Sequence, residues 1–305
     1  TTMSNPLSDR INQLSTSQTL AMAALARELK AQGKDIISLS LGEPDFNTPD
    51  FIKEAAKKAI DENYSTYSPV DGYMELKEAI CRKFKRDNNL DYKPSQIVVS
   101  TGAKQSLYNI AQVMLNDGDE VILPAPYWVS YFEIIKLSGG VPVEVPTSVE
   151  SDFKITPEQL EAAITPKTKM MWFSSPCNPS GSVYNREELT ALAIVLEKHP
   201  HVYIVSDEIY EHINFSGTFC SIGSIPGMLE RTITVNGVAK AFAMTGWRIG
   251  YIGAPEFIAK ACTKIQGQVT SGANSIAQRA AITAVDADPS VLNHMVQAFH
   301  SRRDL

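Results

Sequence analysis

Cysteine is scarce in this sequence, and the spacing of the four cysteines excludes the common roles of clustered thiols. No two of them are close enough to form a metal-binding knuckle or a CxxC redox pair. The five histidines show no metal-ligand spacing either, so we expect no metal site. Scattered free cysteines are typical of a reducing compartment, and the expected location is therefore the cytoplasm.

Long apolar runs and an excess of basic residues are also absent. No apolar stretch reaches the length of a membrane span, and residues 1–10 lack the basic and apolar parts of a signal peptide. The 28 basic and 34 acidic residues give a net charge of −6, and the two signs are mixed along the chain. We therefore expect neither nucleic acid nor a membrane as a partner.

Short apolar runs alternate with helical patterns, and this alternation indicates the fold class. Six runs predict strands: Gln96–Ser100, Glu120–Leu123, Lys169–Ser174, Val202–Asp207, Thr232–Val235 and Ile249–Ala254. Several are apolar throughout, as in strands buried on both faces. One helix is predicted after Asn185, and another begins at Thr156 with Pro157 first and Gln159 closing a capping box. The prediction is an α/β fold with three α/β/α layers and a mostly parallel central sheet.

The two ends of the chain lack the alternation of strand and helix patterns that marks its centre. Two amphipathic helices, around Leu20–Leu29 and Ile52–Ile60, flank the segment Leu39–Phe46, which we interpret as a strand broken by glycine and proline. A helical run starts after Pro289 and continues to the last residue. We expect residues 1–50 to form an N-terminal arm and part of a small domain, and 51–288 a large domain. Residues 289–305 would then begin a C-terminal small domain that is cut short.

Ligands of open α/β sheets bind at the carboxyl ends of the strands, so the residues that follow each strand matter most. After the first predicted strand, Gly102 precedes an apolar-periodic helix. Glycine allows close approach of a ligand, and a helix N-terminus attracts anions such as phosphate. A plain strand-to-helix turn is the alternative, since the segment matches neither the Walker nor the Rossmann pattern.

Further candidates follow the next strands. Trp128 could stack on a flat ring, although simple packing is the alternative. Asn178 lies in a proline- and glycine-rich turn, from which its amide could donate. Asp207 ends an apolar strand, where a carboxylate needs a cation, a ligand or a helix N-cap role.

Lys240 lies among Val238, Phe242 and Met244, and desolvation there would lower the pKa of its amine and activate it toward carbonyl groups. The alternative is an ordinary surface lysine. Taken together, the phosphate cradle, stacking ring, acid, polar donors and lysine are what pyridoxal phosphate requires.

Seven motifs carry a family resemblance: GEPDF at 42–46, YSPVDG at 67–72, STGAKQ at 100–105, PAPYW at 124–128, PCNPSG at 176–181, SDEIY at 206–210 and AKAFAMTGWRIGY at 239–251. From about Leu39 to Arg303 the sequence resembles the class I and II aminotransferases, which are pyridoxal-phosphate enzymes of fold type I. In detail it is similar to their bacterial aspartate aminotransferase branch.

The resemblance implies roles for individual residues. Lys240 would form a Schiff base with the cofactor and later move the proton. Asp207 would pair with the pyridinium nitrogen, Asn178 and Tyr210 would hydrogen-bond the phenolic oxygen, and Trp128 would stack on the ring. Four residues would hold the phosphate: Gly102, Ala103, Lys104 and Arg248.

Two further roles concern the substrate and the assembly. Gly42 would place its backbone near the substrate carboxylate, with Trp128 and Asn178 beside it. Tyr67 would reach the phosphate of a neighbouring subunit, which implies a homodimer with shared sites. The sequence departs from some relatives in having Gly237 three residues before the lysine, where they have a serine. The arginine that binds the substrate α-carboxylate in this family has no counterpart here and is expected beyond the sequence.

The expected reaction, by resemblance to this branch, is a ping-pong transfer of the amino group from aspartate to 2-oxoglutarate, with aromatic amino acids, alanine or prephenate as alternative substrates. A β-lyase or a synthase with the same cofactor is one alternative. A non-catalytic ligand-sensing domain is another, although no basic helix-turn-helix segment precedes Gly42. A dehydrogenase is disfavoured because no GxGxxG follows a first strand.

Overall fold

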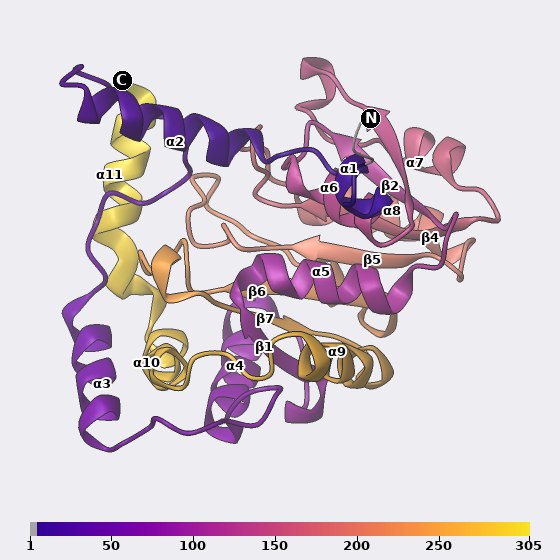
Figure 1. Cartoon of the computed structure of the whole chain (residues 1–305). Helices are drawn as coiled ribbons and strands as arrows, with labels where there is room; N and C mark the ends of the chain where they lie inside the picture. Colours follow the sequence, from indigo (N-terminus) through magenta and orange to yellow (C-terminus); the bar gives the residue numbers. More distant parts are fainter. Residues whose placement is uncertain (1–4) are drawn as a thin grey trace.

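The computed structural model describes residues 5–305 and contains a seven-stranded sheet between helical layers (Figure 1). The strands are β1 (Ile97–Thr101), β2 (Glu120–Ala125), β3 (Val141–Pro146), β4 (Thr168–Ser174), β5 (Tyr203–Asp207), β6 (Thr232–Gly237) and β7 (Ile249–Gly253). Their order is β1-β7-β6-β5-β4-β2-β3. Only β7 runs antiparallel to its neighbours, so the other six strands point the same way. The predicted α/β fold with a mostly parallel sheet is confirmed.

Helices precede, connect and follow the strands. The α-helices are α1 (Asp9–Gln13), α2 (Gln18–Ala31), α3 (Asp50–Asp61), α4 (Met74–Asn88), α5 (Gly102–Met114), α6 (Ser130–Leu137), α7 (Pro157–Ala163), α8 (Arg186–Glu197), α9 (Glu256–Val269), α10 (Ser275–Asp286) and α11 (Asn293–Asp304). Short 3-10 turns are η1 (Pro94–Gln96), η2 (Val149–Ser151), η3 (Ile222–Ser224), η4 (Leu229–Arg231), η5 (Thr245–Trp247) and η6 (Pro289–Leu292). Within residues 5–305, no helix has both the length and the hydropathy needed to cross a membrane.

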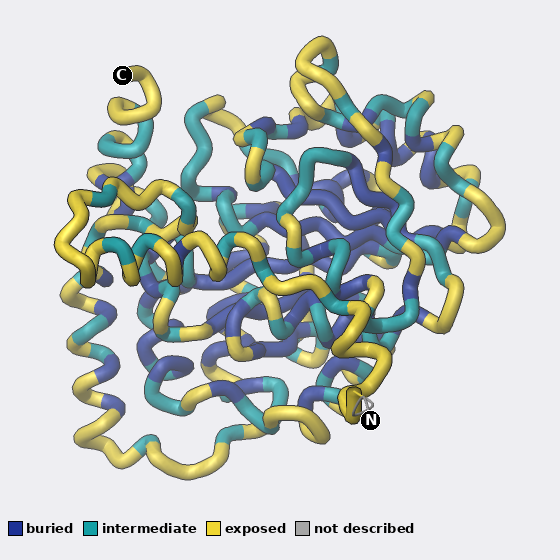
Figure 2. Tube along the Cα trace, turned by 45° about the horizontal axis from the view of Figure 1, so that its top comes forward, coloured by how far each residue is buried: buried dark blue, intermediate teal, exposed yellow. Residues whose placement is uncertain are grey.

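Both faces of the sheet are apolar, which explains why the strand runs do not alternate with polar residues. Val121 in β2 faces the core that includes α5, α6 and α9, whereas Ile122 faces the core that includes α7 and α8. Toward β1, that second face is covered by α4 and α10. The sheet is therefore the middle of three layers, and Figure 2 shows the interior of the molecule, where the central strands lie, as mostly buried.

Local sequence signals set several helix starts as predicted. Asn185 caps α8 through a hydrogen bond from the backbone of Glu188, and Thr156 with Gln159 forms the capping box of α7. Strand β3 was not predicted. It is an edge strand with Pro142 and Pro146, and only one of its six residues is buried, so it produces no apolar run.

The interpretation of Leu39–Phe46 as a strand is wrong. The segment is irregular, with Leu39 90% exposed, and no strand of the described chain pairs with it. Gly42 and Pro44 interrupt any ladder, and without a partner strand an extended segment gains no hydrogen bonds. The two predicted helices on either side of it are present as α2 and α3, and η6 with α11 forms the helical run after Asp288.

Candidate cofactor and substrate site

A pocket of about 500 Å³ lies where the parallel strands end. Nine of the predicted site residues line it: Gly42, Ala103, Lys104, Trp128, Asn178, Asp207, Tyr210, Lys240 and Arg248. They come from the segments after β1, β2, β4, β5 and β6 and from the irregular N-terminal segment. Gly102 adjoins the pocket through its contact with Arg248. Tyr67 lies outside it and is 94% exposed.

One end of the pocket is built to attract an anion. Helix α5 begins at Gly102, whose φ is +81°, and its N-cap residue Thr101 makes no side-chain capping bond. A side chain on Gly102 would collide with the guanidinium of Arg248, so only glycine lets that guanidinium lie against the helix N-terminus. Helix N-H groups and a guanidinium together form a site suited to phosphate.

Three cationic side chains, Lys104, Lys240 and Arg248, line the pocket, and none of them forms a salt bridge within residues 5–305. Partial burial lowers the pKa of Lys104, and the nearby charge of Arg248 lowers it further. Burial also lowers the pKa of Lys240; Glu43 opposes this shift, whereas Arg248 adds to it. Three cations and a helix N-terminus in one pocket would all be stabilised by an anionic ligand.

Asp207 lies at the end of β5, between its ladder partners Ser174 in β4 and Val235 in β6. The residue is 5% exposed, and burial raises the pKa of its carboxyl group against hydrogen bonds from Tyr131 and from the Ile209 backbone. No helix starts here, so the alternative role as a helix N-cap is excluded. No salt bridge within residues 5–305 uses this carboxylate, which leaves it free to pair with a positively charged ligand atom.

Lys240 joins the N-terminal segment to the sheet, because its amine donates a hydrogen bond to the Gly42 carbonyl. A side chain on Gly42 would lie 3.5 Å from the Tyr210 hydroxyl and 3.8 Å from the Lys240 amine. Burial, with the charge of Asp207, raises the pKa of Tyr210 to about 12, so its hydroxyl remains a donor at neutral pH. The amine, the hydroxyl and the Gly42 backbone therefore meet in one place.

The aromatic and amide candidates complete the lining. The Lys104 ammonium lies 4.8 Å from the centroid of the Trp128 ring, which places this ring beside the anion end. Asn178 belongs to the turn after β4, and the Ser175 backbone N-H in that turn donates to the Asp207 carbonyl at 3.1 Å. The turn is thus tied to the strand that carries Asp207.

Some lining residues could not be found from the sequence. Ser17, Leu20 and 39–41 reach the pocket from the N-terminal region, and Tyr131 reaches it from α6. Tyr131 follows Trp128 by three residues, but nothing in its spacing indicates a polar role. Nothing in the sequence indicates that the N-terminal residues line this pocket, because they reach it only through the tertiary fold.

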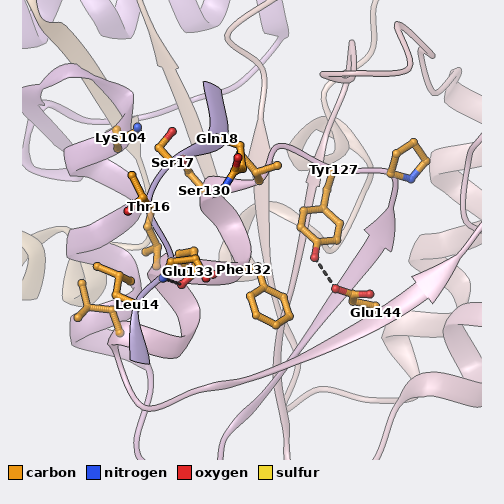
Figure 3. Close-up of a pocket in the computed structure, with 15 residues that line it drawn as sticks. Leu14, Thr16, Ser17, Gln18, Lys104, Tyr127, Ser130, Phe132, Glu133 and Glu144 are labelled. Carbon is orange, nitrogen blue, oxygen red and sulfur yellow. Dashed lines mark hydrogen bonds between the residues drawn. The ribbon is translucent and has the colours of Figure 1, made fainter. Parts of the chain in front are cut away.

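A second cavity of about 710 Å³ adjoins the first and shares four lining residues with it: Ser17, Lys104, Tyr127 and Val129. Figure 3 shows the Tyr127 hydroxyl pointing to Glu144, with which it forms a 2.5 Å hydrogen bond. Residues 14–18 and α6 form the opposite wall, where Ser15 N donates to the Glu133 carboxylate at 3.1 Å.

The structure also brings together three residues of metal-ligating type that chain spacing does not reveal. Ligand atoms of Asp87, Glu211 and His212 lie within 4.8 Å of one another. Both acids already have cationic partners, since Asp87 pairs with Arg86 at 2.6 Å and Glu211 pairs with Lys83. These ion pairs account for the cluster without a metal.

Comparisons with known proteins identify the family. Residues 34–305 match the family described as aminotransferase class I and II. The chain is 53% identical over 301 residues to an aspartate/prephenate aminotransferase of Cereibacter sphaeroides, covering 98% of this chain and 75% of that protein. It is 49% identical to the aspartate aminotransferase of Geobacillus stearothermophilus, with 98% and 76% covered.

Comparisons with solved structures point to the same family. The aspartate aminotransferase from Rhizobium meliloti superposes with a TM-score of 0.95 at 44% identity, over 99% of this chain and 76% of that one. The Thermus thermophilus aspartate aminotransferase with maleate gives 0.95 at 44% identity, over 99% and 79%. An aromatic aminotransferase from Pyrococcus horikoshii gives 0.88 at 38% identity, over 97% and 75%. The chain therefore belongs to the class I and II aminotransferases.

Proposed function

We propose that this chain binds pyridoxal phosphate at Lys240 and transfers the amino group of aspartate to 2-oxoglutarate in a ping-pong reaction. The observation that carries the proposal is the convergence, in one pocket, of an amine, a buried carboxylate and an anion-binding helix N-terminus. The cofactor carries an aldehyde, a basic ring nitrogen and a phosphate, so each of these groups has a counterpart.

The bound cofactor supplies an electron sink for negative charge at the substrate Cα. Lys240 attaches the cofactor, and its amine, once released, moves the proton at Cα; its lowered pKa suits both tasks. Asp207 would hold the ring nitrogen in its protonated form, because a buried carboxylate that forms no salt bridge within residues 5–305 gains from that charge.

The remaining residues orient the reactants. Backbone N-H groups of 102–104 and the Arg248 guanidinium would hold the phosphate, and Trp128 would stack on the ring. Asn178 and Tyr210 would hydrogen-bond the phenolic oxygen. The Gly42 backbone, already in contact with Lys240, lies where a substrate carboxylate would approach.

Aspartate is supported by the relatives. Those from C. sphaeroides and G. stearothermophilus are named for aspartate, and the T. thermophilus structure contains maleate, a four-carbon dicarboxylate like aspartate. Prephenate is a second candidate substrate, because the name of the C. sphaeroides relative includes it.

We also propose that the chain is cytoplasmic and forms a homodimer. Residues 51–288 would form the cofactor-binding domain, and residues 1–50 and 289–305 would be parts of a small domain. Tyr67 is 94% exposed, yet its segment is held, since Ser275 donates to the Thr66 carbonyl at 2.8 Å and Gln266 to the Val70 carbonyl at 2.8 Å. An exposed tyrosine in a segment that hydrogen bonds fix in place is well suited to contact a second subunit. Sedimentation at micromolar concentration should give a dimer mass, and a monomer would contradict the shared site.

Covalent trapping tests the cofactor assignment. The protein is incubated with pyridoxal phosphate, reduced with borohydride, digested and analysed by mass spectrometry. We expect one adduct at Lys240, none in Lys240→Ala, and an unchanged adduct in Lys264→Ala, which removes an exposed lysine of α9. An adduct only at surface lysines would overturn the proposal.

A single-turnover assay then tests the reaction. Loaded protein mixed with aspartate should release oxaloacetate in an amount that matches the cofactor. Release of a 2-oxo acid only from another amino acid would keep the transaminase assignment and refute aspartate. In a parallel assay without an amino acceptor, repeated turnover of an amino acid that carries a leaving group at Cβ, such as cystathionine, to pyruvate, ammonia and the released thiol would indicate a β-lyase.

A further inference from the structure

The buried Tyr131 hydroxyl contacts the centre of the proposed cofactor site. Tyr131 is the second residue of α6, and its backbone N-H donates to the Trp128 carbonyl at 3.0 Å. Its side chain is 1% exposed, and its hydroxyl donates to Asp207 Oδ2 at 2.5 Å. A hydrogen bond this short between a neutral hydroxyl and a carboxylate is among the stronger kinds in proteins.

Aromatic rings surround the Tyr131 ring and leave it little freedom to move. Tyr127 lies parallel to it at 6.5 Å, and Trp128 and Trp172 meet it edge-on, each at 5.7 Å. Such contacts stabilise one ring orientation. The hydroxyl is therefore held at a set position relative to the end of β5.

The carboxylate of Asp207 has few other partners. Its second oxygen accepts from the Ile209 backbone N-H at 3.3 Å, and the charge of Lys240 favours its ionised form. The other titratable groups that act on this pair are Tyr210 and Cys177. Burial and the Asp207 charge raise the pKa of Tyr131 far above its usual value, so the hydroxyl stays a donor.

We propose that Tyr131 is a positioning residue for Asp207, whose carboxylate it orients and keeps charged toward the ring nitrogen of the cofactor. This inference rests on the proposed function. Without the hydroxyl, Asp207 would hold its own proton more readily, and a neutral acid is a poor partner for a protonated ring nitrogen.

The test is Tyr131→Phe, which keeps the ring and removes only the hydroxyl. The dissociation constant of pyridoxal phosphate is measured by equilibrium dialysis between pH 5 and 9. We expect roughly tenfold weaker binding at pH 7, the effect of losing one hydrogen bond to a charged group. The acid limb, where affinity falls as Asp207 gains a proton, should move up by about one pH unit.

Two controls separate positioning from packing. Tyr92→Phe removes another buried hydroxyl, bonded to Thr234 at 3.0 Å, and should leave both readouts unchanged. Replacement of Tyr131 by 3-fluorotyrosine keeps the packing but makes a stronger donor, so the acid limb should move down instead. This second variant also keeps the test valid if Tyr131→Phe fails to fold.

Each result has a distinct meaning. If the unmodified protein does not bind pyridoxal phosphate, the proposed function fails. If it binds and Tyr131→Phe binds equally well across the pH range, the positioning role fails. A uniform loss of affinity without any shift of the acid limb would show a packing role only and would also overturn the inference. In Asp207→Asn protein, Tyr131→Phe should have no further effect.

Discussion

The acidic residues at and just after the end of β5 lie in different surroundings. Asp207 lines the pocket, whereas Glu208 and Glu211 contact Asn88 at the end of α4. Glu208 accepts hydrogen bonds from Ser206 at 2.8 Å and from Ser221 at 2.5 Å. This buried polar network ties the chain after β5 to α4, behind the residues of the proposed site.

The side chains of Glu208 and Glu211 differ in charge at neutral pH. Burial raises the pKa of Glu208 to about 8, an effect that Ser221 opposes and the charge of Glu211 reinforces. Burial also works against ionisation of Glu211, but Lys83 and His212 hold its pKa below the usual value. Lys83 and Glu211 therefore form a charged pair, while Glu208 is mostly protonated at neutral pH.

This difference predicts how stability depends on pH. The pKa of Glu208 is about 8 in the folded chain, and its ordinary value is 4.5. Between these two pH values the folded chain keeps a proton on Glu208 that the unfolded chain has lost. The free energy of unfolding should fall as pH rises through this window, by at most about 5 kcal/mol at roughly 1.4 kcal/mol per unit. Glu208→Gln should remove much of this slope, as measured by urea unfolding at pH 5 to 9.

Glu211→Gln is the matched comparison. It leaves the buried Lys83 without its partner, so we expect a loss of roughly 3–5 kcal/mol with no such slope removed. If Glu208→Gln keeps the full pH dependence of the unmodified protein, Glu208 is not the group that binds the proton.

At the scale of single elements, helix starts are set by local side chains. Asn185 accepts from the Glu188 backbone N-H at 2.9 Å, and Glu188 accepts in return from the Asn185 backbone N-H at 3.0 Å. Helix α8 packs on the face of the sheet away from α5, so its cap concerns stability and not the pocket.

Asn185→Ala should therefore destabilise the protein by about 1 kcal/mol, because the first turn of α8 loses its cap. Cofactor affinity should not change. Thr190→Ala is the control in the same helix, since its hydroxyl only donates to the Arg186 carbonyl and its loss should cost less than about 0.5 kcal/mol. Urea unfolding measures both, and equal effects of the two changes would show that the cap contributes little.

At the scale of the whole molecule, burial is uneven. Ala23 is the only buried residue between positions 5 and 47, whereas all residues of β6 are buried. Figure 2 shows the same contrast between the N-terminal region and the sheet. The N-terminal segment is held to the rest by polar contacts, among them Thr245 to Glu43 at 2.7 Å and Arg302 to Asp45 at 2.7 Å.

Hydrogen exchange should follow this pattern, because segments with few buried contacts open locally at little cost. Helix α2 has 14 residues and one buried side chain, and α4 has 15 residues and seven. In the same sample, amides of α2 should exchange much faster than those of α4, although the two helices are nearly equal in length. Equal protection of both helices would contradict the unequal stability.

Sequence alone determined the features that depend on short-range pattern. Buried strands have apolar runs, and caps have Asn185 or Thr156. Most site candidates lie at or after a strand end, so parallel pairing brings distant candidates such as Asp207 and Lys240 to one edge. The same reasoning failed at β3, whose exposed edge needs no apolar run, and at Leu39–Phe46, which has no partner strand.

Only the tertiary structure decided contacts between segments far apart in the chain. The Lys240 amine meets the Gly42 carbonyl, Lys83 meets Glu211, and Tyr131 meets Asp207, across separations of 198, 128 and 76 residues. No periodicity or spacing records such pairs, because they depend on how the strands are ordered and which faces the helices cover. The physical reason is that charge, burial and hydrogen bonding at a site are properties of its surroundings, and folding assembles those surroundings from separate segments.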